Sequence, residues 1–209
     1  MPQLPRSSKM RRAGGESLSG SKEKLQFHPL TPERWPDLER LFGSSGACGG
    51  CWCMWWRLTR KEFDAGKGEG NRRAMRTLVE EGSAVPGLLA YDAGRPVGWC
   101  AVAPRGEYGR LARSRTLAPV DDRPVWSVVC FFVARAWRGR GVAQRLLEAA
   151  VEHVRRQGGK VVEGYAVEPK NDRMPDVFAY HGPLALFRAC GFEEVARRSA
   201  TRPIVRRHL

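Results

Sequence analysis

A short run rich in glycine and arginine carries the clearest chemical signal in this chain. The run is Arg138, Gly139, Arg140, Gly141, Val142 and Ala143, followed by Gln144. The first turn of a helix leaves about four backbone N–H groups without intrahelical partners, and the helix dipole adds partial positive charge there. Glycines at positions 139 and 141 let a ligand approach the main chain closely. The run is therefore predicted to cradle a pyrophosphate group.

The neighbouring segments place this run between a strand and a helix. The apolar segment 125–134 is typical of a buried strand. Apolar residues then recur at three- and four-residue steps, which predicts a helix over 141–157 with one apolar stripe. A Walker loop would need a Lys after Gly141, and a Rossmann fingerprint would need a glycine where Gln144 stands. A plain structural turn is the remaining alternative.

Three parts of this region resemble the GNAT superfamily of N-acetyltransferases. Arg138, Gly141 and Ala143 match the family's acyl-coenzyme A loop, which is Arg or Gln, two residues, Gly, one residue, then Gly or Ala. The segment 131–133 stands where the family's strand bonds the pantetheine arm, and 187–192 resembles its aromatic, three residues, Gly-Phe ending. The resemblance covers about 125–195. It implies an α/β fold with a mixed, mostly antiparallel central sheet, flanked by helices and splayed where the cofactor enters.

The resemblance also implies a reaction and a set of cofactor contacts. In this family an amine attacks the thioester of acetyl-CoA directly, in a ternary complex rather than through an acyl-enzyme. A backbone N–H, here near Phe132 and Val133, would hold the thioester carbonyl. The residues expected to bind acetyl-CoA are Phe131, Phe132, Val133, Arg138, Gly139, Arg140, Gly141, Val142, Ala143 and Gln144.

Two catalytic residues follow from the same comparison. Glu163 lies in an otherwise apolar strand, 160–167, where some family members carry a glutamate, and strand alternation places Tyr165 on the same face. Glu163 is expected to act as the base, and a structural carboxylate paired with an arginine is the alternative. The family's usual acid, a tyrosine, is replaced by Phe187. Tyr180 is the expected substitute and His181 a second one, with core or turn roles as alternatives for both.

The segment from Cys48 to Arg57 concentrates cysteine and tryptophan. Trp55 and Trp56, with His181, are expected to bind the amine acceptor, because tryptophan faces attract apolar groups and cations. Packing as core is the alternative. Cys48, Cys51 and Cys53 invite a zinc hypothesis, but structural zinc takes four ligands, often as two separated pairs. No metal is therefore predicted. A covalent mechanism through Cys130 is disfavoured because no partner residues stand out.

Composition and charge limit the remaining classes. The chain has 209 residues, of which 42% are hydrophobic, and a formal net charge of +14. Residues 1–24 are expected to be a disordered basic tail, and 25–209 a single domain. No apolar stretch reaches membrane-span length, no secretory signal follows the basic N-terminus, and a cytoplasmic location is expected.

The positive charge leaves two further functions open. Basic proteins attract anionic cofactors and nucleic acids alike. A nucleic-acid- or ribosome-associated module on the same scaffold is therefore an alternative to the transferase. A non-catalytic acyl-CoA sensor is another, because Phe187 has no hydroxyl. A homodimer stays open.

The other elements are expected to complete the domain. Strands are predicted at 25–28, 88–92, 97–102, 192–197 and 203–207, and helices at 31–42, 71–81 and 184–190, with a short helix capped by Thr59. Residues 104–123 are polar and basic and are predicted to be a loop.

Overall fold

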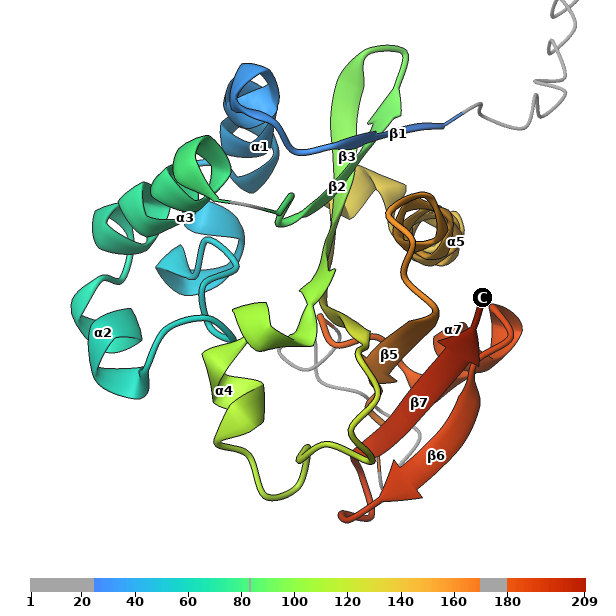
Figure 1. Cartoon of the computed structure of the whole chain (residues 1–209). Helices are drawn as coiled ribbons and strands as arrows, with labels where there is room; N and C mark the ends of the chain where they lie inside the picture. The colour runs from blue at the N-terminus through green and yellow to red at the C-terminus, as the bar shows by residue number, and fades with distance from the viewer. Residues whose placement is uncertain (1–24, 83, 170–179) are drawn as a thin grey trace, which may run out of the picture.

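The computed structural model describes residues 25–82, 84–169 and 180–209, and the expected tail at 1–24 lies outside them. Its centre is an open sheet in the order β1-β2-β3-β4-β5-β7-β6 (Figure 1). The strands are β1 (Gln26–Pro29), β2 (Gly87–Asp92), β3 (Arg95–Pro104), β4 (Trp126–Val133), β5 (Val161–Tyr165), β6 (Glu193–Arg197) and β7 (Pro203–His208). Only β4 and β5 pair in parallel, so the prediction of a mixed, mostly antiparallel sheet is confirmed.

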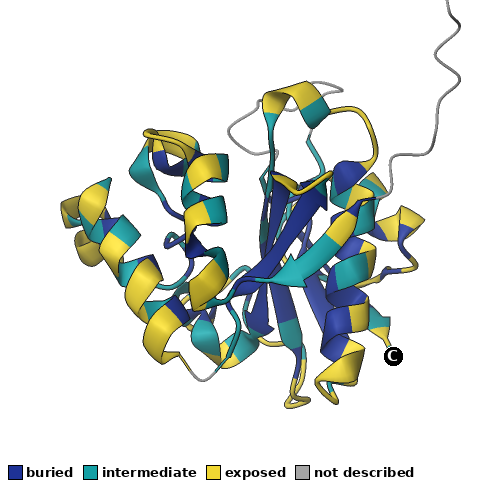
Figure 2. Ribbon diagram, turned by 90° about the horizontal axis from the view of Figure 1, so that it is seen from above, coloured by how far each residue is buried: buried dark blue, intermediate teal, exposed yellow. Residues whose placement is uncertain are grey.

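Helices cover both faces of this sheet. They are α1 (Trp35–Phe42), α2 (Arg60–Ala65), α3 (Glu69–Glu81), α4 (Gly109–Ala112), α5 (Val142–Arg156) and α7 (Leu184–Ala189). Figure 2 shows buried strands between helices whose outer sides are exposed. Among the described residues, no helix has both the length and the apolar character that crossing a membrane requires.

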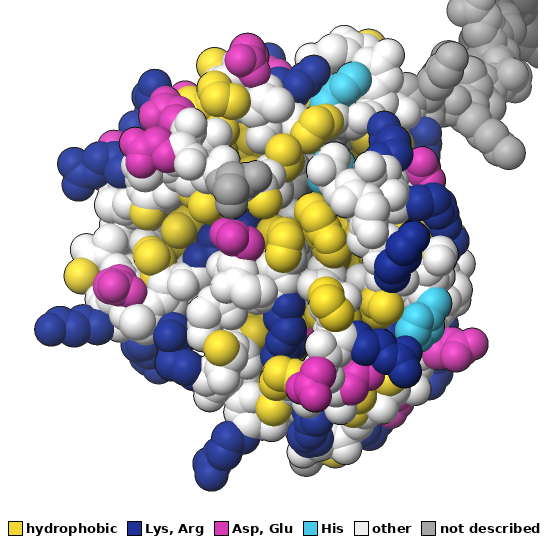
Figure 3. Space-filling view, viewed as in Figure 1, with side chains coloured by type: hydrophobic (Ala, Val, Ile, Leu, Met, Phe, Trp, Pro, Cys, Tyr) yellow, Lys and Arg dark blue, Asp and Glu magenta, His cyan; other side chains and the backbone are white. Residues whose placement is uncertain are grey.

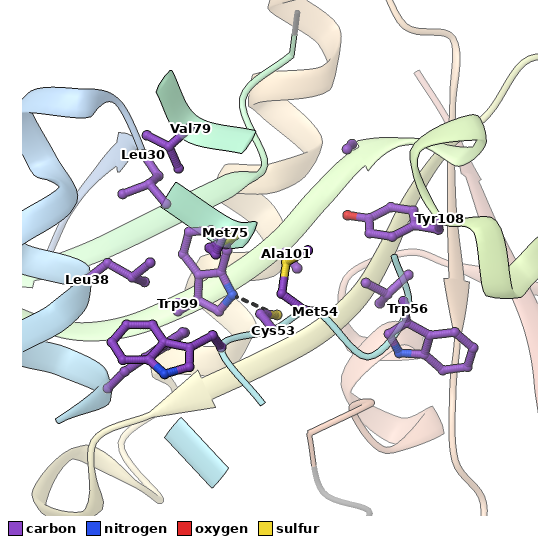
Figure 4. Packing of buried hydrophobic residues seen from close by; sticks show 14 of the residues in the cluster. Leu30, Leu38, Cys53, Met54, Trp56, Met75, Val79, Trp99, Ala101 and Tyr108 are labelled. Atoms are coloured by element: carbon purple, nitrogen blue, oxygen red, sulfur yellow. Dashed lines mark hydrogen bonds between the residues drawn. The ribbon is translucent and has the colours of Figure 1, made fainter. Parts of the chain in front are cut away.

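Alternation along the central strands produces two separate cores. On β3, Trp99 and Ala101 face the core formed with α1 and α3, whereas Cys100 and Val102 face the core formed with α5 and α7. Figure 4 shows part of the first core around Trp99. Because both faces are covered, these strands are apolar in an unbroken run rather than at alternate positions.

A local signal accounts for the start of α2 but not for that of α1. Thr59 accepts a hydrogen bond from the Glu62 amide at 3.3 Å, and the Glu62 carboxylate accepts one from the Thr59 amide at 2.8 Å, which makes a capping box for α2. Thr31 makes no side-chain cap, and the chain enters α1 through a 3-10 turn, Pro32–Arg34. The prediction of a loop over 104–123 is wrong in part, because α4 forms there and buries Leu111 completely.

The strands β4 and β5 pair over only three positions. The last aligned pair is Val128 with Gly164. Further along β4, the Phe131 amide donates instead to the backbone carbonyl of Tyr180, at 2.6 Å. The sheet is therefore split beyond Val128, as the expected splay requires, and the split lies next to the N-terminus of α5.

Candidate active site

A pocket of about 670 Å³ opens at the split end of β4. Its lining comes from four segments: the end of β4, the turn that leads into α5, the chain from the end of α1 into α2, and the segment around α7 that carries Tyr180 and Leu186. Val133 and Val142 belong to the core beneath α5, whereas Phe132 and Trp55 pack against the core beneath α1. The pocket therefore crosses the sheet from one face to the other, around the point where β4 loses its neighbour.

The glycine run forms one end of the pocket. Gly141 caps α5 in the left-handed conformation, with φ 74°, and Gly139 has the same φ. A Cβ built at either glycine would meet no atom within 4 Å, so both face open space. The N-terminal N–H groups of α5 are thus presented to a space wide enough for an anion, which fits the predicted pyrophosphate cradle.

Most residues of the predicted cofactor set line this pocket. They are Phe131, Phe132, Val133, Arg138, Gly139, Gly141, Val142, Ala143 and Gln144. The exception is Arg140, whose guanidinium lies 5.1 Å from the centre of the Trp137 ring and which is outside the lining. Arg138 donates from Nε to the Val133 carbonyl at 3.2 Å and so ties the cradle to the end of β4.

The backbone of β4 identifies which amides point into the split. The Phe131 amide donates away from β3, to Tyr180, whereas the Ala134 amide donates toward β3, to the Val97 carbonyl at 3.0 Å. Because strand groups alternate in direction, the Val133 amide points the same way as that of Phe131. Of the two residues expected to hold a carbonyl oxygen, Val133 therefore has the right direction and Phe132 does not.

Aromatic side chains from the segment before α2 form the other end of the pocket. Trp55 meets Phe63 edge to face with 5.1 Å between ring centres, and the Arg110 guanidinium lies 3.7 Å above Trp55. Trp56 lines the pocket while its side chain is buried in the first core. Both tryptophans thus reach the pocket, and Trp56 also fulfils the alternative core role.

Tyr180 lies in the pocket and His181 lies behind it. Burial raises the pKa of Tyr180 to about 12, so the hydroxyl stays protonated at neutral pH. His181 is 3% exposed and lies outside the lining, with its ring 5.4 Å from Trp56 and 3.9 Å from Tyr180. Burial, followed by the charge of Arg202, lowers the pKa of His181 to about 3. His181 therefore packs against Trp56 and Tyr180 and is not one of the lining residues, and direct binding of substrate by His181 stays a prediction.

The structure places Glu163 away from the pocket, in a buried polar network. Its carboxylate accepts from Arg105 at 2.8 Å, from Arg206 at 2.8 Å and from the Tyr165 hydroxyl at 2.7 Å. Its side chain is 0% exposed and is not part of the lining. The geometry is that of the alternative, a structural carboxylate paired with arginine.

Several lining residues were not predicted. Two of them are Cys130 and Phe63. Strand alternation could have predicted Cys130, because it places Cys130 on the same face as Phe132. Phe63 lies in α2, the helix that Thr59 caps. Cys48, Cys51 and Cys53 also line the pocket, and in the described part of the chain no His, Cys, Asp or Glu cluster could hold a metal ion. Phe187, at the family's tyrosine position, is fully buried against the Phe131 and Phe192 rings.

The fold recurs in many solved structures of low sequence identity. A GCN5-related N-acetyltransferase from Kribbella flavida is 20% identical, with 90% of this chain and 100% of that chain covered and a TM-score of 0.52. The PaiA N-acetyltransferase from Thermoplasma acidophilum, solved with coenzyme A, is 11% identical, with 89% and 99% covered and a TM-score of 0.52. The acetyltransferase yncA from Salmonella typhimurium, solved with its cofactor acetyl-CoA, is 12% identical, with 88% and 94% covered and a TM-score of 0.52.

Comparisons of sequence give a more specific result. A search of curated proteins finds no match to this chain. The family model described as the acetyltransferase (GNAT) family matches residues 52–192. This range includes the glycine run before α5, strand β4, and the aromatic residues Trp55, Trp56 and Phe63 that line the other end of the pocket. With two thirds of its length matched by that family model, the chain belongs to the GNAT family of acetyltransferases.

Proposed function

We propose that this protein transfers the acetyl group of acetyl-CoA to the nitrogen of an amine, by direct attack in a ternary complex. The observation that carries the proposal is a single pocket that holds an anion cradle at one end and an aromatic wall at the other. Because the two ends meet at the split in the sheet, donor and acceptor would react without an acyl-enzyme between them.

The cosubstrate is acetyl-CoA, in keeping with the family and with structural neighbours solved with coenzyme A or acetyl-CoA. The glycine cradle and the first turn of α5 would bind its pyrophosphate, where a side chain at Gly139 or Gly141 would intrude. The pantetheine arm would lie along β4 beyond Val128, in the place that β5 leaves. The acetyl group would then reach the level of Val133.

Two groups of this chain would assist the transfer. The amine nitrogen forms a bond to the acetyl carbon, the carbon–sulfur bond breaks, the amine loses a proton, and the thiolate gains one. The Val133 amide would stabilise the oxygen that becomes negative during attack. Among the described lining residues, Tyr180 is the one with a side-chain hydroxyl. Its raised pKa means that the hydroxyl carries its proton at neutral pH and could donate it to the departing thiolate.

The acceptor side favours an amine with an apolar body. Trp55, Trp56 and Phe63 form its wall, with Phe42 and Phe132 nearby in the lining. Such a surface stabilises an aliphatic or aromatic group by burial, at about 25 cal/mol for each Å² removed from water. Small hydrophilic amines would gain little from it.

An amine panel tests this function. Thiol release from acetyl-CoA is followed with arylalkylamines, aliphatic amines and polar amines, and each product is identified by mass spectrometry. We expect N-acetylated products and the highest kcat/KM for amines with an apolar body. Tight binding of acetyl-CoA without any product would favour the sensor instead, and salt-sensitive binding of nucleic acid without cofactor binding would favour the nucleic-acid module.

A further inference from the structure

Two cysteines from distant parts of the sequence lie in the acceptor half of the pocket and pack in the same core. Cys53 lies on the segment that precedes α2, and Cys130 lies on β4, one residue before the segment that would align the pantetheine arm. Both line the pocket. Acetyl transfer as proposed above uses neither thiol, so their juxtaposition is left without a role.

The backbone around Cys53 is held in an unfavourable conformation. Trp52 has φ 43° and Cys53 has φ 60°, values that residues with a side chain rarely adopt. Packing holds them there, since Trp52 stacks on Trp35 with 5.9 Å between ring centres and is buried beside Phe42. The strained turn thus aims the Cys53 side chain at the sheet, toward Trp99 on β3.

A hydrogen-bond donor on β3 fixes the sulfur of Cys53. The indole N–H of Trp99 donates to Cys53 Sγ at 3.2 Å, as the dashed line in Figure 4 shows. Trp99 is 0% exposed, so this bond is shielded from water. An N–H donor of this kind stabilises a thiolate more than a thiol, because the negative sulfur is the stronger acceptor.

The two thiols have opposite ionisation tendencies. The hydrogen bond from Cys130, then the one from Trp99 and the charge of Arg57, lower the pKa of Cys53 against the opposing effect of burial. The same thiol–thiol hydrogen bond and burial raise the pKa of Cys130 well above its ordinary value. The Trp99 donor, which Cys53 has, marks Cys53 as the nucleophile of the pair.

Cys48 and Cys51 also line the pocket, but Cys48 is exposed and burial raises the pKa of the Cys51 thiol. The two cysteines outside the pocket are Cys100 and Cys190. Cys100 lies on the opposite face of β3, in the core with α5, and burial raises the pKa of its thiol. Cys190 follows α7, where burial raises the pKa of its thiol to about 12. Neither lines the pocket, so both serve as controls.

We propose that Cys53 and Cys130 form a thiol–disulfide exchange site that reacts with low-molecular-weight disulfides entering the pocket. The Cys53 thiolate attacks one sulfur of the disulfide RSSR, which forms a mixed disulfide and releases RS⁻. The Cys130 sulfur then attacks Cys53 Sγ and releases the second RS⁻. The protons of the two cysteines leave on these thiolates. The net reaction is two protein thiols plus RSSR giving one Cys53–Cys130 disulfide and two RSH.

Such a disulfide would act chiefly on the acceptor end of the pocket. It ties the segment that carries Trp55 and Trp56 to β4, and it leaves the glycine cradle at the start of α5 unchanged. Oxidation is therefore expected to lower acetyl transfer by roughly tenfold or more through misplacement of the acceptor. The affinity for acetyl-CoA should fall less than the rate, because the pyrophosphate cradle is unchanged, and dithiothreitol restores the rate.

The full-length protein, reduced and then incubated with glutathione disulfide, tests this site. After alkylation under denaturing conditions, peptide mass spectrometry should find the Cys53 peptide linked to the Cys130 peptide. The link should be absent from Cys53→Ser and Cys130→Ser and should persist in Cys100→Ser and Cys190→Ser. Circular dichroism of each variant confirms that it is folded.

Two results would overturn the proposal. They are the absence of thiol loss in the wild type, and a glutathione adduct on another cysteine without a Cys53–Cys130 link. Because the link is read by mass, its failure is distinct from a failure of the transferase activity, which the amine panel reports separately.

Discussion

The Phe131 amide donates a 2.6 Å hydrogen bond to the Tyr180 carbonyl, at the point on β4 where pairing with β5 has stopped. This hydrogen bond gives a partner to a strand amide that would otherwise have none after the split. The same contact holds Tyr180 where its side chain lines the pocket. The same split directs the Val133 amide toward the pocket. The break in the sheet and the proposed proton donor therefore lie side by side.

Replacing Tyr180 with phenylalanine removes the proposed proton donor. We expect kcat to fall by about a hundredfold and KM for acetyl-CoA to stay the same, because the lost hydroxyl acts on the leaving thiolate. The matched control is Tyr91→Phe, which removes a hydroxyl that bonds Asp37 at 2.8 Å, outside the pocket. Equal kcat values in the two variants would remove Tyr180 from the chemistry.

The pH dependence of that defect follows from the pKa of Tyr180, which is about 12. The hydroxyl stays protonated from pH 7 to 10, so the ratio of wild-type to Tyr180→Phe rates should be constant over this range. Steady-state rates at saturating substrate measure the ratio. A ratio that approaches one by pH 10 would mean that Tyr180 ionises far below its assigned pKa.

Glu163→Gln is expected to affect stability rather than catalysis. It leaves Arg105 and Arg206 without the carboxylate that both contact, and breaking a buried ion pair in this way costs about 3 kcal/mol or more of the free energy of unfolding. The kcat of folded protein should change by less than roughly twofold, because Glu163 is outside the pocket.

Urea unfolding and kinetics on the same preparation separate these effects. Asp121→Asn is the control, since its carboxylate also bonds Arg206, at 2.7 Å, but from a half-exposed position, and a smaller loss of stability is expected. A large fall in kcat with unchanged stability would return Glu163 to the role of base.

His181 should make the protein less stable in mild acid. Its pKa is about 3 when folded and about 6.5 when unfolded, so below pH 6.5 the unfolded state binds the additional proton. The free energy of unfolding should then fall by up to about 1.4 kcal/mol for each pH unit. Urea midpoints at pH 7 and pH 5 measure the loss, which should be smaller in His181→Gln. An identical loss in that variant would show that other groups cause it.

Local patterns predicted much of the fold, because they reflect local physics. The apolar stripe of α5 and the glycine at its start follow from helical geometry, and the capping box at Thr59 involves residues three positions apart. The wrong assignment of 104–123 shows the limit. Leu111 joins a short helix because the core covers it, and the polar residues around it conceal that.

The site was harder to predict, because its residues are joined by contacts between distant positions. Arg105 and Arg206 reach Glu163 across 58 and 43 positions, and neither arginine differs in sequence from the many others. Cys53 and Cys130 likewise line one pocket although they are far apart in the sequence. Basic side chains also give no sign of a nucleic-acid surface on the face in Figure 3, where Lys and Arg are interspersed with Asp and Glu.

Binding of acetyl-CoA by a matched pair of glycine variants tests the central claim most directly. Gly141 and Gly94 have φ values of 74° and 78° and open space around a built Cβ, but only Gly141 lines the pocket. Calorimetric titration should show wild-type affinity for Gly94→Glu and a loss of roughly a hundredfold or more, about 2.7 kcal/mol, for Gly141→Glu. Equal affinity of the two variants would contradict the placement of the pyrophosphate at the start of α5.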